Sequence, residues 1–136
     1  MNNIRQYGAT MHVPVMPKEV ISYLDIKKDG LYVDGTIGLG GHTSLILNQL
    51  SDRGHLIGID RDAEAIELCK KSLLPHRSSL SLFNDSYNNI GSILNRFNNL
   101  KVDGILLDLG LSSMQLDKSN RGFSHQMNSN LDMRYD

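Results

Sequence analysis

The chain has 136 residues, of which 40% are hydrophobic and 21% are charged, and its formal net charge at pH 7 is -1. This length fits one domain with a substantial core, and the composition is typical of a soluble globular protein rather than a fibrous or membrane-spanning one. The small net charge excludes a global basic field, so any contact with nucleic acid must come from a local patch.

The elements predicted along the chain alternate between helices with apolar residues at a spacing of 3.6 and short apolar strands. In chain order they are a helix from Pro17 through Leu24, a strand over 31–34, a helix through 45–50, a strand over 55–60, a helix capped by Asp62, a strand over 79–83, a helix capped by Asn89 and extending through Phe97, and a strand over 102–109.

This alternation predicts an α/β fold of the Rossmann type, because strands separated by helices form right-handed crossovers and a parallel sheet. A doubly wound sheet needs further strands after the fourth, whereas residues 110–136 are mostly polar. We therefore expect a fold truncated after the fourth strand, and a chain that is the N-terminal part of a longer protein.

The cell compartment is predicted from two features. The only cysteine, Cys69, cannot form an internal disulfide, and residues 1–14 lack the apolar segment of a secretion signal. Cys69 also shares an apolar helix face with Ile66 and Leu73, which makes it a core residue rather than a nucleophile. The sequence thus predicts a cytoplasmic protein with no membrane partner.

Acidic and amide side chains follow the predicted strands, where ligands bind in an open α/β sheet. They are Asp34, Asp60, Asn84, Asp85 and Asp108. This arrangement predicts one ligand site at the carboxyl edge of the sheet.

The glycine-rich segment GLGGHT, at 38–43, narrows the class of ligand. A dinucleotide fingerprint would need a third glycine at Thr43, and no phosphate-binding P-loop motif occurs. Asp60 lies about 20 residues after Gly40, where an acid accepts the ribose hydroxyls of an adenosine cofactor. Asp34 and Asp108 would repel a pyrophosphate and attract an ammonium or sulfonium group, as in S-adenosylmethionine.

Several longer motifs resemble the MraW/RsmH family. They are HVPVMPKEV (12–20), YVDGTIGLGGHT (32–43), GIDRDAEAI (58–66), ILLDLGLSSMQLD (105–117), and RGFS with LDMRYD (121–136). Family members have a class I methyltransferase fold and use S-adenosylmethionine to methylate N4 of one cytidine in the decoding region of 16S ribosomal RNA. The resemblance implies this activity, with the small ribosomal subunit as partner.

The resemblance also implies how much of the family fold is present. Family members are more than twice as long, so residues 1–136 match the N-terminal part of the methyltransferase domain, without the helical insertion and the remaining strands. Activity of this chain alone is therefore doubtful. The oligomeric state is left open, with a homodimer among the alternatives.

The site residues that the resemblance implies fall into two groups. Cofactor contacts are expected at Gly40, Gly41, His42, Asp60, Tyr87, Asp108 and Gln115. Tyr87 replaces an expected phenylalanine, which keeps a stacking face and adds a hydroxyl. Methyl transfer to nitrogen needs no metal and no covalent enzyme intermediate, so positioning is the main contribution. Candidates near the target base are Asp108, Ser112, Ser113 and Asp132, with Asp108 favoured at the cofactor.

Two other functions remain open at this stage. A nicotinamide-dependent oxidoreductase shares the same α/β start, and a non-catalytic module could bind the cofactor or the ribosome without turnover. Three basic residues, Lys118, Arg121 and Arg134, are candidates for contact with RNA phosphates.

Overall fold

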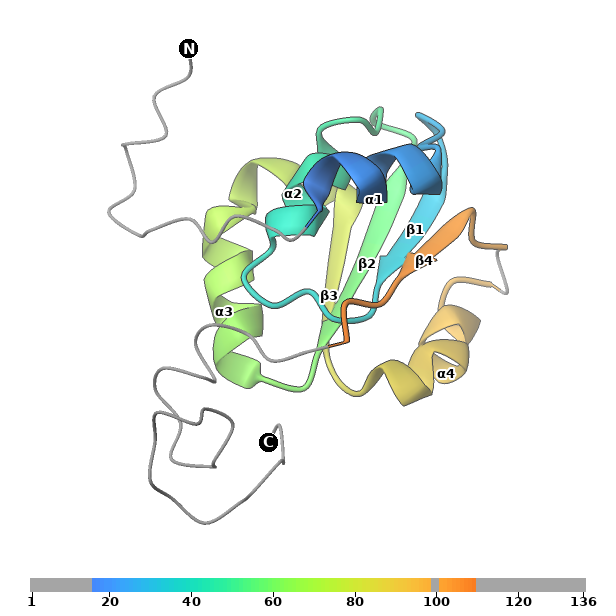
Figure 1. The fold of residues 1–136 in the computed structure, drawn as a ribbon. Coiled ribbons are helices and arrows are strands. Elements are labelled where there is room, and N and C mark those ends of the chain that lie inside the picture. Colours follow the sequence, from blue (N-terminus) through green and yellow to red (C-terminus); the bar gives the residue numbers. More distant parts are fainter. Residues whose placement is uncertain (1–15, 99–100, 110–136) are drawn as a thin grey trace.

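The computed structural model describes residues 16–98 and 101–109. Within them, four parallel strands form one sheet in the order β3-β2-β1-β4 (Figure 1). The elements in chain order are α1 (Pro17–Leu24), β1 (Leu31–Asp34), α2 (Gly41–Leu47), β2 (His55–Asp60), α3 (Ala63–Ser72), the 3-10 helix η1 (Leu74–Ser79), β3 (Leu80–Asn84), the 3-10 helix η2 (Tyr87–Asn89), α4 (Ile90–Asn95) and β4 (Gly104–Leu106). The predicted α/β class is confirmed.

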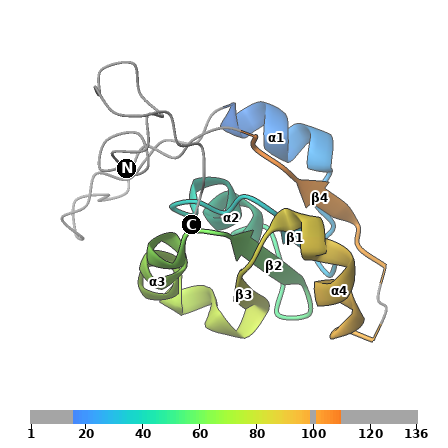
Figure 2. The ribbon, with the colours of Figure 1, turned by 90° about the horizontal axis from the view of Figure 1, so that it is seen from below.

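Helices cover both faces of the sheet, because successive strand residues point to opposite sides. Tyr32 and Leu56 belong to the core cluster beneath α1, α2 and α3. Val33 and Ile57, one residue further along each strand, belong to the second cluster with Ile93 of α4. Figure 2 shows α4 on the face opposite the other three α-helices. β1 and β2 are therefore buried on both faces, as their apolar runs predict.

The strand β4 is shorter than the predicted 102–109, and the difference has a structural cause. Before the strand, the N–H of Asp103 still donates to the carbonyl of Leu31 at 2.7 Å, but the carboxylate of Asp103, not a backbone carbonyl, accepts the N–H of Leu31 at 2.9 Å. After it, the N–H of Asp108 turns to the hydroxyl of Thr36. Among the described strands β4 pairs only with β1, and Leu107 remains 41% exposed.

Four other boundaries differ from the prediction. β3 begins one residue later, at Leu80, because η1 continues through Ser79, and it ends one residue later, at Asn84. The helices α2 and α4 end at Leu47 and Asn95, before the predicted Leu50 and Phe97, although both later residues still pack against the core. The apolar spacing therefore identified core residues correctly beyond the point where the helices end.

The predicted cap at Asn89 is wrong. Its side chain makes no cap hydrogen bond to α4 and instead donates from Nδ2 to Oδ1 of Asp85 at 2.6 Å. The hydroxyl of Ser86 caps the preceding η2 by accepting the N–H of Asn88. A 3-10 turn thus precedes the α-helix, which moves the capping position three residues toward the N-terminus.

The predicted cap at Asp62 is confirmed, since its Oδ1 accepts the N–H of Glu64 at 2.9 Å. Asp62→Ala should lower the free energy of unfolding by about 1 kcal/mol, because the first turn of α3 loses an acceptor. Denaturant titration measures the change, and Asp62→Asn, which keeps an oxygen at the cap, is the matched control. Equal losses in both variants would contradict the capping role.

None of the helices in the described part of the chain is long and apolar enough to cross a membrane.

Candidate functional site

The polar side chains at the carboxyl ends of the strands meet at one edge of the sheet. Asp34, Asp60 and Asn84 are the last residues of β1, β2 and β3, and Asp60 pairs directly with Asn84. Asp108 lies just beyond β4, where its N–H donates to Oγ1 of Thr36 in the loop after β1 at 2.7 Å. The sequence prediction of one site at this edge is therefore consistent with the structure.

The glycine loop, residues 35–40, passes close to α3. Gly38 and Gly40 have φ angles of +53° and +85°, which L side chains rarely adopt. A Cβ at Gly40 would lie 3.2 Å from Cδ1 of Leu73 and 3.3 Å from Sγ of Cys69, whereas a Cβ at Gly38 would meet only a backbone oxygen 4.0 Å away. Gly40 is thus required for both conformation and space, and Gly38 for conformation alone.

Gly38 is held on both sides of the loop. Its N–H donates to Oδ2 of Asp60 at 2.8 Å, and its carbonyl accepts a hydrogen bond from Sγ of Cys69 at 3.2 Å. Burial raises the pKa of the Cys69 thiol to about 12, so the thiol stays protonated at neutral pH and able to donate. The prediction that Cys69 is a core residue is confirmed by its full burial.

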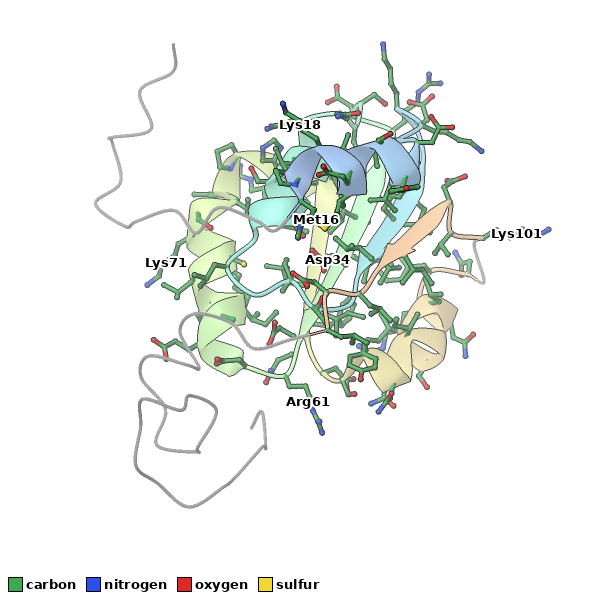
Figure 3. All side chains as sticks on the ribbon, in the orientation of Figure 1. Met16, Lys18, Asp34, Arg61, Lys71 and Lys101 are labelled. Carbon is green, nitrogen blue, oxygen red and sulfur yellow. The ribbon has the colours of Figure 1, made fainter. Side chains whose placement is uncertain are left out.

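Asp34 lies in the interior at the end of β1, where the chain enters the glycine loop (Figure 3). It is 1% exposed. Its Oδ2 accepts the hydroxyl of Thr43 at 2.7 Å and its Oδ1 accepts the N–H of Thr36 at 3.1 Å. Burial raises the pKa of Asp34 to about 6, against the opposing effect of these two hydrogen bonds. Asp34 therefore fixes the loop rather than facing a ligand directly, which differs from the direct attraction expected from sequence.

Asp34→Asn should flatten the dependence of the free energy of unfolding on pH. The folded wild type protonates Asp34 near pH 6 and the unfolded chain near 3.8. Because the folded state binds the proton more tightly, this group stabilises the fold at low pH and the contribution is lost as pH rises through that window.

Between about pH 4 and pH 7.5, the free energy of unfolding of the wild type should fall by about 3 kcal/mol relative to that of Asp34→Asn. Denaturant titrations across this range measure it. Asp52→Asn, at an exposed position, controls for the loss of one carboxylate. Parallel profiles of wild type and Asp34→Asn would contradict the prediction.

Asp60 joins the glycine loop to the start of α3. Its Oδ1 accepts the N–H of Asp62 at 2.9 Å, while its Oδ2 accepts that of Gly38. Burial raises the pKa of Asp60, and these N–H donors oppose the rise. Each carboxylate oxygen can accept more than one hydrogen bond, so Asp60 can hold the loop and still accept ligand hydroxyls.

Asp108 and His42 lie on either side of the point where the strand order reverses. β1 pairs with β2 on one side and with β4 on the other, and ligands of open α/β sheets bind at such a switch point. Oδ2 of Asp108 is 4.0 Å from Nδ1 of His42, and the Asp108 side chain is 50% exposed whereas that of His42 is 9% exposed. Asp108 thus offers a solvent-open carboxylate at the switch point.

A polar pocket of about 260 Å³ lies beyond the ends of β2 and β3. It is lined by Arg61, Asn84, Asp85, Ser86 and Asn89. The hydrogen bond from Asn89 and the N–H of Ser86 lower the pKa of the Asp85 carboxyl. The pocket therefore contains an anionic acceptor at neutral pH.

Tyr87 lies beside both this pocket and the glycine loop. The preceding Ser86 lines the pocket, and a Cβ at Gly35 would lie 3.1 Å from Cβ of Tyr87. The Tyr87 side chain is partly exposed, at 37%. Its place is compatible with the stacking role that the sequence resemblance implies.

Two contacts of the site were missed by sequence reasoning. Cys69 donates to Gly38, and Thr36 accepts from Asp108. The first has no sequence signal. The second has none either, because its two residues are 72 positions apart in the sequence.

Several predicted site residues lie outside the described residues. They are Ser112, Ser113, Gln115 and Asp132, together with the basic residues Lys118, Arg121 and Arg134. Within residues 16–98 and 101–109, no group of three or more His, Cys, Asp or Glu side chains is arranged to hold a metal ion.

Solved structures share this fold. A candidate rRNA methylase from Clostridium thermocellum superposes with a TM-score of 0.63 at 21% identity, covering 75% of this chain and 55% of that protein. An S-adenosylmethionine-dependent O-methyltransferase from Thermotoga maritima gives a TM-score of 0.52 at 14% identity, covering 62% of this chain and 32% of that protein. At these identities the likeness establishes the fold.

Sequence relatives are much closer. The ribosomal RNA small subunit methyltransferase H of Halothermothrix orenii is 51% identical over 92% of this chain, and that of Caldicellulosiruptor bescii is 46% identical over the same share. The chain spans about 40% of the length of each of these relatives. The model of the MraW methylase family matches residues 9–136. The chain belongs to the MraW methylase family.

Proposed function

We propose that residues 1–136 are the N-terminal, S-adenosylmethionine-binding part of a methyltransferase domain. The complete protein then methylates N4 of a cytidine in the decoding region of 16S ribosomal RNA, in the cytoplasm. Family membership and the names of the relatives support methylation of small-subunit RNA. The observation that carries the proposal is the arrangement of Asp60, Gly40 and Asp108 around one edge of the sheet.

The residues at this edge fit the cofactor. Asp60 would accept the ribose hydroxyls, and the backbone of Gly40, Gly41 and His42 would contact the cofactor from a loop that packs closely on Leu73 and Cys69 because Gly40 has no Cβ. Asp108 would face the positively charged methionine end, and Tyr87 would stack on the base. In the bound state S-adenosylmethionine supplies a methyl group made electrophilic by its sulfonium.

The protein contributes mainly by positioning, because in-line displacement at a methyl group needs no covalent enzyme intermediate. The lone pair of cytosine N4 is delocalised into the ring, so an acceptor close to the amino group would favour attack. Ser112, Ser113 and Asp132 remain candidates for that place, and Asp108 is assigned first to the cofactor. A target base must also be exposed from its stack before its edge can react.

Two alternative chemistries fit the described residues less well. Methylation at cytosine C5 needs a thiolate nucleophile, but Cys69 is the only cysteine, is buried, and has its pKa raised to about 12. A nicotinamide dinucleotide fold uses a third glycine for close packing of helix on strand. Thr43 occupies that position, and its buried hydroxyl bonds to Asp34.

A transfer assay tests the proposal. The complete protein is incubated with methyl-labelled S-adenosylmethionine and small subunits that lack the modification, and label should appear on N4 of one cytidine. Subunits that already carry the methyl group are the matched control and should take up no label. Cofactor binding without transfer would instead support a non-catalytic module, and binding of NAD in place of S-adenosylmethionine would support an oxidoreductase.

Asp108→Asn should remove most of the turnover of the complete protein. The substitution keeps the shape of a half-exposed side chain but removes a negative charge near the sulfonium. We expect weaker cofactor binding to account for most of the loss, whereas normal binding with slow transfer would place Asp108 at the target base. Calorimetry and single-turnover kinetics separate the two. Methylation at the wild-type rate would refute both roles.

A further inference from the structure

Thr36 connects two carboxylates that differ sharply in environment. Its N–H donates to Oδ1 of the buried Asp34, and its Oγ1 accepts the N–H of Asp108. Asp34 is held from the other side by the hydroxyl of Thr43 in α2. Thr36 therefore links the buried Asp34 to the residue that carries the exposed carboxylate at the switch point, Asp108, through two hydrogen bonds.

The ladder between β1 and β4 ends before Asp108. The N–H of Gly35 donates to the carbonyl of Leu106 at 2.9 Å, and β4 ends at that residue. Leu107 packs against the backbone of Gly35, since a Cβ there would collide with Cδ2 of Leu107. Beyond this point the Thr36 hydroxyl is the contact that fixes the backbone of Asp108 within the described residues.

We propose that Thr36 is a positioning residue for the cofactor site, whose hydroxyl sets the place of the Asp108 backbone and thereby of its carboxylate. The carboxylate lies 4.0 Å from the imidazole of His42, which belongs to the same rim of the site. The hydrogen bond of 2.7 Å between the Asp108 N–H and Oγ1 of Thr36 fixes the backbone next to the carboxylate, and so restricts where a sulfonium or ammonium group can contact that carboxylate. The inference rests on the proposed function, which assigns Asp108 to S-adenosylmethionine.

Two substitutions at Thr36 separate its hydroxyl from its shape. Thr36→Val keeps the branched side chain but cannot accept the N–H of Asp108, whereas Thr36→Ser keeps the acceptor. In the complete protein, Thr36→Val should weaken S-adenosylmethionine binding about three- to tenfold, the effect of one neutral hydrogen bond. Thr36→Ser should restore most of that affinity.

A double-mutant cycle tests whether Thr36 acts through Asp108. In an Asp108→Ala background the carboxylate is absent, so Thr36→Val should weaken binding by less than about twofold. A full additional loss in that background would overturn the proposal, because Thr36 would then act on the cofactor independently. Wild-type affinity of the single Thr36→Val variant would overturn it as well.

Amide hydrogen exchange provides a readout that does not depend on the cofactor. Without ligand, the Asp108 amide should exchange faster in Thr36→Val than in wild type or Thr36→Ser. Unchanged exchange overturns the contact itself. If the wild-type protein binds no S-adenosylmethionine, the proposed function fails, and the exchange rates still decide whether Thr36 positions Asp108.

Discussion

Gly40→Val should abolish S-adenosylmethionine binding by the complete protein while leaving its helical content nearly intact. The φ angle of +85° is strongly unfavourable for a β-branched residue, at a cost of about 1–3 kcal/mol. The new Cβ would also press on the side chains of Leu73 and Cys69. The loop must therefore move, and it leaves the conformation in which its backbone can approach the cofactor.

Two glycines of the same chain serve as matched controls. Gly38→Asn places a residue that tolerates positive φ where a Cβ meets only a distant oxygen, so binding should weaken much less. Gly91→Ala in α4 adds a methyl group to open space and should leave binding unchanged. Calorimetry measures affinity and circular dichroism measures helicity. Wild-type affinity in Gly40→Val would mean that this glycine only shapes a turn.

Gly40→Ala provides a graded second variant in case valine prevents folding. Alanine carries the conformational penalty and the Cβ contacts but no branched methyl groups. Its affinity should lie between those of wild type and Gly40→Val in the folded protein. An affinity for Gly40→Ala equal to that of Gly91→Ala would argue against any close backbone approach at the loop.

The order of the α-helices and strands could be predicted from the sequence, because helices place apolar residues at a spacing of 3.6 whereas the strands are short apolar runs between turn residues. The two 3-10 helices were not predicted. Asp62 was correctly identified as a cap, since capping depends only on residues two or three positions away. The prediction of Asn89 as a cap and the predicted ends of β4 were wrong. Asn89 finds a better partner in Asp85, and the ends of β4 depend on Asp103 and Thr36 at contacts across the sheet.

The site likewise has a part that could be predicted from the sequence and a part that could not. Acids at the ends of parallel strands must share one edge, so the proximity of Asp34, Asp60 and Asp108 follows from topology. The environment of each carboxylate does not follow from topology. The contact between Thr36 and Asp108 joins residues 72 positions apart, and the burial of Asp34 depends on how α2 closes over the loop through Thr43. Such contacts become visible only once the chain is folded.

Asp60→Ala should weaken S-adenosylmethionine binding by roughly 1.5–3 kcal/mol, the value of a hydrogen bond to a charged group. The structure adds a second reason for a large effect. The carboxylate of Asp60 also accepts the N–H groups of Gly38 and Asp62, so the variant loses a tether of the glycine loop together with the ribose acceptor. Calorimetry on the folded variant measures the total.

A change of ligand separates these two roles of Asp60. The 2′-deoxy analogue of S-adenosylmethionine lacks one ribose hydroxyl, so the wild type should bind it more weakly than the parent cofactor. Asp60→Ala should bind both ligands equally, because the acceptor of that hydroxyl is absent. If Asp60→Ala binds the analogue more weakly than the wild type does, that loss of affinity measures the effect of the loosened loop. Asp62→Ala, which removes a neighbouring cap without touching the Gly38 tether, should keep the wild-type preference. If Asp60→Ala also kept that preference, Asp60 would hold the loop through Gly38 and the ribose would be bound elsewhere.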